Sequence, residues 1–464
     1  MKYLLTVIAV ISVLLSSAIA GNYPKVSNYY LDVTFIPKQA GIEGQCKVSF
    51  DPDVSFGDTA SFYLHGEMWV DSILSDGSPI DFTQEKIFYP FDYSAIANKA
   101  VLPMPESKSL EIYYRGYLNP SKVTAPSNYM RVDKSGVYLR SLGYSLWFPV
   151  FLESWKDDYR VDFPEVIIRT PREMQSIFVG HRLADSVSGE HRISRWKADN
   201  TKIFDAQCTA HRFIEKKLGQ VYIYSYDDSL SAASTDSILQ FVNKCTSKFA
   251  SMYRSVESEE YYIMEMPKYG DISSNNITGI SEDWWHNFNR ETWSKRGLAH
   301  ELVHPFVKID IAGSDPLFAM IIEGFPSYFH LPILAEFLGQ KWYDTYIENT
   351  EKTYLKNKNT GLNRRGRPLP EEKPIDKISY NEIGTYKDEF VLNDRVVLFF
   401  NFLKAKMGER NFGEFSRELF NSEIIGDDMF RNLVFKHYSG DSQDIHLWLS
   451  TNEYPDRFQL NNLH

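Results

Sequence analysis

Cysteine is scarce in this sequence of 464 residues, which contains only Cys46, Cys208 and Cys245. Three cysteines can form at most one disulfide, so the fold must depend on its core rather than on covalent cross-links. The same scarcity excludes a cysteine-rich zinc ribbon. Internal repeats and low-complexity tracts are absent from the sequence as well.

Positive charge is in deficit, with 50 Lys and Arg against 61 Asp and Glu and a formal net charge of −11. This balance argues against a nucleic-acid partner and against an anionic membrane surface. The apolar run from Leu4 to Leu15 is too short to span a bilayer comfortably. Because Lys2 precedes it and a small-residue site at Ala18-Ile19-Ala20 follows it, residues 1–20 are predicted to be an export signal. We therefore expect a periplasmic or secreted protein with no stable membrane anchor after signal cleavage.

The rest of the chain shows two different patterns of apolar residues. Up to about residue 225, short runs such as Tyr30–Ile36 and Gln45–Phe50 alternate apolar and polar residues, with Gly41 and Gly44 expected to mark the turn between them. This pattern predicts an antiparallel, sandwich-like β-domain over residues 21–225. After Ser229, apolar residues recur at helical spacings, which predicts a mostly helical domain over residues 226–464. The predicted fold class is α+β.

The segment His300-Glu301-Leu302-Val303-His304 carries the strongest chemical signal. On a helix the two histidines lie one turn apart on one face, where they can share a zinc ion, and Glu301 lies beside them to activate the metal-bound water. A catalytic zinc keeps three protein ligands and an open position. Glu323 is the candidate for the third ligand, because a second helix packed on the first can direct its carboxylate at the same metal. The sequence therefore predicts a Zn²⁺ site.

These residues, with Glu323-Gly324-Phe325-Pro326-Ser327-Tyr328, resemble the zinc aminopeptidases of the aminopeptidase N family. That family has HExxH, eighteen intervening residues and then Glu. Trp147-Phe148-Pro149 resembles the family's Trp-Tyr-Pro, and the likeness runs over roughly residues 25–460. It implies a thermolysin-like catalytic domain and a peptide substrate, and hence an exported zinc metallo-aminopeptidase.

The resemblance also implies roles beyond the metal. Gly279-Ile280-Ser281-Glu282-Asp283 is similar to the family's Gly-x-Met-Glu-Asn, in which Gly279 would line the substrate and Glu282 would hold its free amine. A carboxylate suits that role, since a buried ammonium needs a charged partner. For the family's oxyanion-binding tyrosine, Tyr386 is the best placed and Tyr380 the reserve, whereas alignment on the following helix puts Asn393 in that position.

Pro305 departs from the family pattern. It removes a helical hydrogen bond and biases His304 away from helical geometry, so we expect a kink or an early helix end there. Besides aminopeptidase activity, two alternatives stay open. A catalytically degenerate member would bind peptides or a partner without cutting, which Pro305 and the altered Gly279–Asp283 segment favour. The second alternative is a zinc enzyme that acts on internal bonds or on non-peptide substrates.

Overall fold

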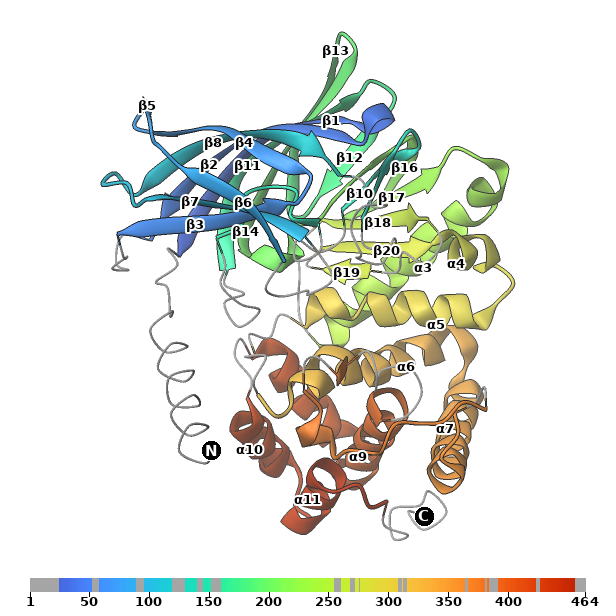
Figure 1. The fold of residues 1–464 in the computed structure, drawn as a ribbon. Coiled ribbons are helices and arrows are strands. Elements are labelled where there is room, and N and C mark those ends of the chain that lie inside the picture. The colour runs from blue at the N-terminus through green and yellow to red at the C-terminus, as the bar shows by residue number, and fades with distance from the viewer. Residues whose placement is uncertain are drawn as a thin grey trace, which may run out of the picture. The chain divides into compact units, whose positions relative to one another are not determined.

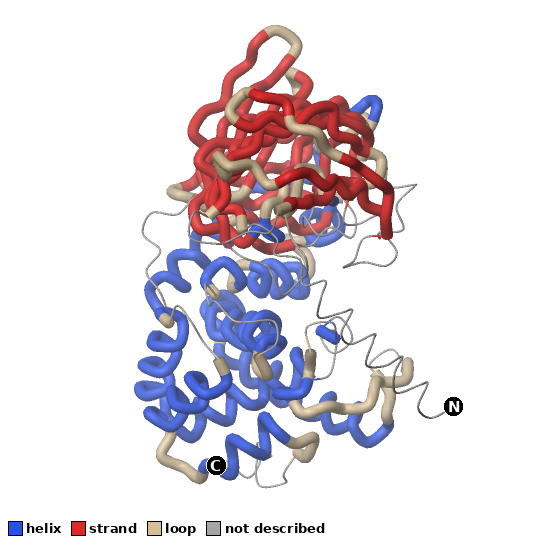
Figure 2. The backbone as a smooth tube through the Cα atoms, turned by 60° about the vertical axis from the view of Figure 1, so that its left-hand side comes forward, coloured by secondary structure: helices blue, strands red, loops and turns tan. Residues whose placement is uncertain are grey.

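The computed structural model describes residues 25–51, 58–88, 96–118, 130–139, 145–151, 160–253, 260–267, 272–274, 276–307, 311, 315–363, 366–379, 382–383, 391–422 and 426–454. The chain divides into two compact units, one ending at Phe213 and the other beginning at Ile214. Strands dominate the first unit and helices the second, as the colours of Figure 2 show. Within the described ranges, no helix combines the length and the apolar character needed to cross a membrane. The expected α+β class, with a β-domain ahead of a helical one, is confirmed.

The first unit consists of three sheets (Figure 1). Its strands are β1 (Val26–Ile36), β2 (Gly41–Phe50), β3 (Thr59–His65), β4 (Met68–Ser75), β5 (Ser78–Pro79), β6 (Thr83–Phe88), β7 (Ile96–Pro103), β8 (Ser109–Tyr117), β9 (Met130–Asp133), β10 (Gly136–Leu139), β11 (Arg160–Pro171), β12 (Gln175–Phe178), β13 (His181–Ser188), β14 (His191–Lys202) and β15 (Cys208–His211). The largest sheet has the order β13-β14-β11-β1-β2-β8-β4-β5, and the others run β12-β15-β10-β9 and β3-β7-β6. Strands β1 and β11 are parallel, and the strands predicted from alternation are confirmed.

Aromatic side chains fill the interior of this unit. Phe163 on β11 and Phe178 on β12 have ring centroids 5.4 Å apart, which joins the eight-stranded sheet to the four-stranded one. Trp147 is fully buried beside them, and its indole N–H donates a hydrogen bond of 3.2 Å to the carbonyl of Ala206. The two cysteines of this unit, Cys46 and Cys208, are free and buried, so burial of apolar surface stabilises the unit without a disulfide.

The turn between β1 and β2 is not where its glycines suggested. Gly41 and Gly44 both lie within β2, and the chain reverses through the 3₁₀ turn η1 (Pro37–Gln39) and Ala40, whose φ is 52°. Gly44 is required for a different reason. A Cβ there would lie 2.3 Å from the ring of Tyr114 on the neighbouring strand β8, so only glycine allows this close approach.

The second unit combines one sheet with a set of helices. Its strands are β16 (Phe213–Leu218), β17 (Val221–Tyr226), β18 (Tyr261–Met266), β19 (Ile272–Ser274) and β20 (Ile277–Ser281), in the order β16-β17-β18-β20-β19. The helices are α3 (Ser229–Met252), α4 (Glu282–Asn287), α5 (Thr292–Glu301), α6 (Phe325–Leu338), α7 (Gln340–Thr360), α9 (Val396–Asn421), α10 (Asp427–His437) and α11 (Ser442–Ser450), with short turns η5 (His304–Phe306), η6 (Met320–Gly324), η7 (Ile375–Lys377) and η9 (Val391–Arg395). Strands β16 and β17 begin before the predicted domain boundary at residue 225 but pair in this sheet, and the division between the two compact units lies at Phe213.

Helix α3 is the first helix of the helical region that the sequence predicted. The Asp228 carboxylate caps it by accepting hydrogen bonds from the backbone N–H groups of Leu230 and Ser231. Its apolar residues at three- and four-residue spacings are buried against β17, and α5, α6 and α9 then pack in turn (Figure 1). This packing brings segments that are distant in the sequence together at α5 and α6, where the predicted ligands lie.

Candidate metal centre

The first predicted ligands come from the end of α5. The helix ends at Glu301, and His304 begins the 3₁₀ turn η5 with Pro305 at its second position, so the early helix end expected from Pro305 is confirmed. The intervening Leu302 and Val303 nevertheless keep right-handed helical dihedral angles. His304 therefore still follows His300 by about one turn, and the two ring centroids are 5.2 Å apart.

Glu323 reaches the same place from η6, a π-helical turn that leads into α6. Such turns are rare and shift side chains relative to a regular helix. Gly324 allows this segment to approach α9, because a Cβ there would lie 2.7 Å from the Val396 side chain. The Ser327 hydroxyl ties the turn together by donating hydrogen bonds of 2.8 Å to the Glu323 carbonyl and 2.6 Å to Asn393 Oδ1. Because α5 and α6 pack together, Glu323 Oε2 lies 3.6 Å from His300 Nε2.

The arrangement of these donors fits a zinc ion. One ligand atom from each of His300, His304 and Glu323 lies within 4.8 Å of the others. A tetrahedral zinc holds such atoms about 2 Å from itself and thus about 3.3 Å from one another, a spacing that small side-chain rotations reach. His300 Nε2 is buried and forms no hydrogen bond with any residue that the structure describes, as expected for a metal-ligating nitrogen. Two neutral imidazoles and one carboxylate are the donor set of a catalytic zinc.

Glu301 borders this group. Its Oε2 lies 3.9 Å from His304 Nε2, and the residue is only 9% exposed. A carboxylate this close to a metal site and this well shielded from water is placed to exchange a proton with whatever occupies the open position.

Known proteins resemble this chain in structure but not detectably in sequence. No protein-family model matches the sequence, and no curated protein does so significantly. Solved structures do match. The M1 zinc metallopeptidase from Deinococcus radiodurans superposes with a TM-score of 0.65 at 16% identity, over 94% of this chain and 95% of that one. A variant of the Deinococcus radiodurans metallopeptidase bound to a Tyr-Ser-Ala substrate gives 0.66 at 16% identity, over 93% and 95%. Yeast LTA4 hydrolase gives 0.66 at 17% identity, over 94% of this chain and 69% of the hydrolase.

The chain has the fold of the M1 zinc metallopeptidases. At 16% identity the similarity concerns the fold. The chemistry of the site is therefore inferred from the residues of this chain. The His-His-Glu group lies within the second unit and is intact.

Gly279 and Glu282, the two residues predicted to contact the substrate, both lie within the described residues. Gly279 belongs to β20, which is paired with β18 on one side and with β19 on the other, so its backbone has no free edge for a peptide. Strand β19 is at one edge of the described sheet and β16 at the other, and β19 packs against η5, which contains His304. The sequence did not distinguish the two strands, because β19 and β20 are both short and only two residues separate them.

Glu282 lies near another carboxyl group. It is the first residue of α4, and its charge acts on the carboxyl of Glu265. Among the described residues, no hydrogen bond or ion pair links Glu282 with the three ligands. Tyr386 and Tyr380 both lie outside the described residues, and Asn393 accepts its hydrogen bond from Ser327.

His330 is a neighbour of the metal group that the sequence analysis did not single out. Its ring lies 5.8 Å from that of His300, nearly at right angles, and its Nδ1 donates a 2.6 Å hydrogen bond to the carbonyl of Pro326. Burial lowers the pKa of His330 well below its ordinary value, so the imidazole is neutral and its Nε2 is unprotonated. The sequence spacing could have indicated His330, because it follows Glu323 by seven residues, which is about two helical turns along the same face.

Proposed function

We propose that this chain is a zinc-dependent aminopeptidase that hydrolyses the amino-terminal bond of peptides. The observation that carries the proposal is the meeting of His300, His304 and Glu323 within a few ångströms, with Glu301 at the border of the group. The M1 fold supports it, because a solved metallopeptidase shares the fold over 94% of the chain.

The residues divide the chemistry between them. His300, His304 and Glu323 would hold Zn²⁺, which when bound acidifies a water molecule and polarises the scissile carbonyl. Glu301 would take the proton of the attacking water and pass it to the leaving amine. The open edge of β19 is suited to hold the peptide backbone by adding it to the sheet as a further strand, close to the turn that contains His304.

The retained Glu301 favours catalysis over binding alone. A protein that only bound peptides would have no use for a nearly buried carboxylate beside two imidazoles, and burying such a charge is costly. The early end of α5 at Glu301, ahead of Pro305, also does not weigh against zinc, because the ligands converge despite it.

Turnover of fluorogenic aminoacyl substrates tests the proposal. We expect hydrolysis that is lost with a zinc chelator and restored by Zn²⁺, and little hydrolysis when the substrate's amine is acetylated. Equal cleavage of free and acetylated substrates would instead identify an enzyme for internal or non-peptide bonds. Zinc binding without any turnover would support a binding protein.

Two variants separate the proton-transfer step from substrate binding. Glu301→Gln should keep its zinc and lose turnover by about 10²–10⁴-fold, the usual contribution of a general base. Glu282→Gln tests the amine-holding role that the resemblance implies. That role requires a higher KM for free-amine substrates, whereas the position of Glu282 beside Glu265 predicts an effect on thermal stability instead.

Export is part of the proposal. Residues 1–20 have the charged start, apolar run and small-residue site of a signal, and a peptidase acting on peptides outside the cytoplasm would need one. Mass spectrometry of the mature protein should find an amino terminus at Gly21 in the periplasm or the medium. An uncleaved chain retained in the cytoplasm would contradict this part alone.

A further inference from the structure

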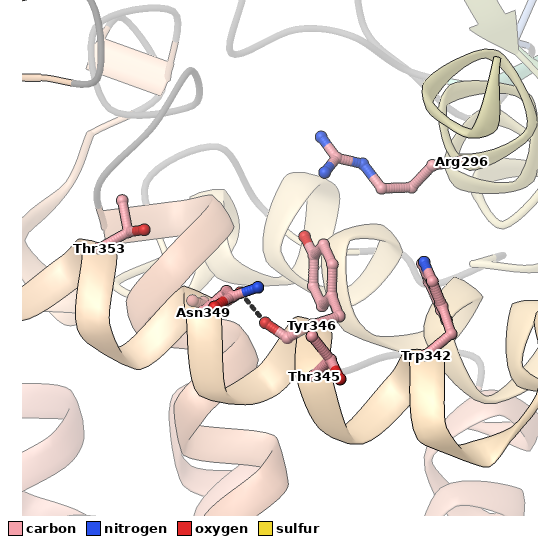
Figure 3. Close-up of a pocket in the computed structure, with 7 residues that line it drawn as sticks. Arg296, Trp342, Thr345, Tyr346, Asn349 and Thr353 are labelled. Carbon is pink, nitrogen blue, oxygen red and sulfur yellow. Dashed lines mark hydrogen bonds between the residues drawn. The ribbon is translucent and has the colours of Figure 1, made fainter.

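A hollow of about 270 Å³ lies between α5 and α7 (Figure 3). Arg296 of α5 extends over it, and α7 supplies the other side. The residues of α7 that line it include Trp342, Thr345, Tyr346, Asn349 and Thr353. We call it the Arg296 hollow.

Among the described residues that line the hollow, Arg296 alone is charged. Its guanidinium lies 5.5 Å from the centroid of the Tyr346 ring, a cation–π contact that holds the group above α7 (Figure 3). It forms no hydrogen bond or ion pair with any described residue. A guanidinium has five N–H donors in a planar fork that matches a carboxylate, so this one is available to an anionic ligand.

The acidic residues nearby on α7 are engaged elsewhere. Asp344 accepts a 2.8 Å hydrogen bond from Gln340, and Glu348 pairs with Lys352 at 3.6 Å. The groups of α7 that do line the hollow are neutral hydroxyls, an amide and aromatic rings. A carboxylate entering from solvent would therefore meet one cation and several neutral hydrogen-bonding groups, with no competing acid in the lining.

The position of Arg296 relates the hollow to the proposed chemistry. Arg296 precedes His300 by four residues and so lies on the same face of α5, about 6 Å along its axis. Its charge also acts on His330, whose ring is 5.8 Å from that of His300. An extended peptide advances about 3.4 Å per residue, so two residues beyond a bond at the metal group span about the axial offset between His300 and Arg296.

We propose that the Arg296 hollow is a subsite for a substrate carboxylate, which makes short peptides with a free carboxyl end the preferred substrates. This inference rests on the proposed function, because the metal group fixes where the cleaved bond lies. The carboxylate has two possible sources, the end of a tripeptide or an acidic side chain at the same distance.

Matched tripeptides test the subsite. We compare kcat/KM for Ala-Ala-Ala, for its carboxyl-terminal amide and for Ala-Ala-Asp amide, in the wild type and in Arg296→Gln. We expect the wild type to prefer the free acid over the amide by about 10- to 100-fold, the effect of one hydrogen-bonded charge. In Arg296→Gln this ratio should fall to near one. Recovery of the wild-type rate by Ala-Ala-Asp amide would assign the subsite to acidic side chains as well; a rate like that of the plain amide would restrict it to the carboxyl end.

The control variant is Lys341→Gln, which removes an exposed positive charge from α7 outside the hollow and should keep the wild-type ratio. An unchanged ratio in Arg296→Gln, or an equal loss for acid and amide, would overturn the proposal. If the protein cleaves none of these peptides, the proposed function fails, and calorimetric binding of Ala-Ala-Ala and its amide to the same variants still decides the subsite. Binding that does not distinguish acid from amide would then reject it.

Discussion

His300 Nε2 and Glu323 Oε2 lie 3.6 Å apart, although the two residues come from different helices. Their side chains are only 14% and 11% exposed, so the carboxylate has given up most of its water. Desolvation of a carboxylate is costly unless a positive charge compensates it, and a dication held by both groups would supply that charge. The geometry thus couples metal binding to the packing of α5 against α6.

Replacing Glu323 with Gln should weaken zinc binding by more than about 100-fold, because loss of a direct ligand exceeds the 10–100-fold effect of an outer partner. Competition with a chromophoric chelator measures the affinity. Zinc should also raise the melting temperature of the wild type far more than that of the variant, since a ligand stabilises only the state that binds it. Glu301→Gln is the matched control and should keep its zinc. Equal affinities in Glu323→Gln and the wild type would exclude Glu323 as a ligand.

Pro305→Ala tests whether the proline strains the metal-binding segment. Pro305 lies at the start of η5, where the neighbouring N–H of Phe306 bonds to Val303 at 2.9 Å and that of Val307 to His304 at 3.0 Å. Proline fits such a position without strain and limits the unfolded chain, so alanine should lower the free energy of unfolding by about 0.4–1 kcal/mol. Denaturant unfolding measures this change. A gain in stability would mean that the proline distorts the segment.

Regular patterns in the sequence predicted much of this fold. Alternation located strands such as β1 and β2, and the HExxH spacing located the metal group even though α5 ends before His304. Both signals are local, because they follow from the period of a strand or a helix. The metal group needed one further inference, that Glu323 would come from a second packed helix.

Features that depend on pairing between distant segments could not be read in this way. Gly279 has the neighbours of a substrate-lining segment in the sequence, but only the sheet order shows that β19, not β20, is at the edge. Gly44 suggested a turn because glycine is common in turns. The structure shows instead that a glycine is needed at this position because the Tyr114 ring of another strand lies against it. His330 likewise has meaning only beside His300.

Arg395→Met should strongly destabilise the second unit. The Arg395 side chain is fully buried, and its Nη1 lies 2.8 Å from Glu372 Oε1. Its Nη2 donates hydrogen bonds to the carbonyls of Leu447 and Trp448, at 3.0 and 2.9 Å, near the end of α11. Removing the cation leaves the helix-end carbonyls without their donor, at a cost of about 1–3 kcal/mol for each unsatisfied group. It also removes one of the two cations paired with Glu372, which keeps Lys358 at 2.6 Å. The shift in the urea midpoint measures the loss of stability.

The double variant with Glu372→Gln separates the two contributions of Arg395. If the buried charge of Glu372 causes most of the loss, neutralising it should recover part of the stability lost in Arg395→Met. A double variant no more stable than the single one would assign the loss to the α11 carbonyls instead. A single variant as stable as the wild type would contradict the anchoring role altogether.

Glu265 gives the second unit a predictable response to pH. The residue is fully buried on β18 and accepts hydrogen bonds of 2.9 Å from the Tyr226 N–H and from the Ser231 hydroxyl. His286 Nε2 lies 3.1 Å from its carboxyl. Burial is the largest cause that raises the pKa of Glu265 to about 7, and the nearby charges of Asp228 and Glu282 act in the same direction.

Because the folded pKa lies above the unfolded value, the native state holds this proton more tightly. The resulting stabilisation is complete below about pH 4.5 and is lost as the pH rises through 7, with a maximum near 3 kcal/mol for a shift of about 2.5 pKa units. The side chain introduced in the Glu265→Gln variant cannot ionise. The thermal midpoint of the variant should therefore rise relative to that of the wild type as the pH increases from 5 to 8. Differential scanning calorimetry across this range makes the comparison. Parallel curves for the two proteins would show that Glu265 is already ionised at pH 5 and that its neighbours, His286 above all, stabilise the charge.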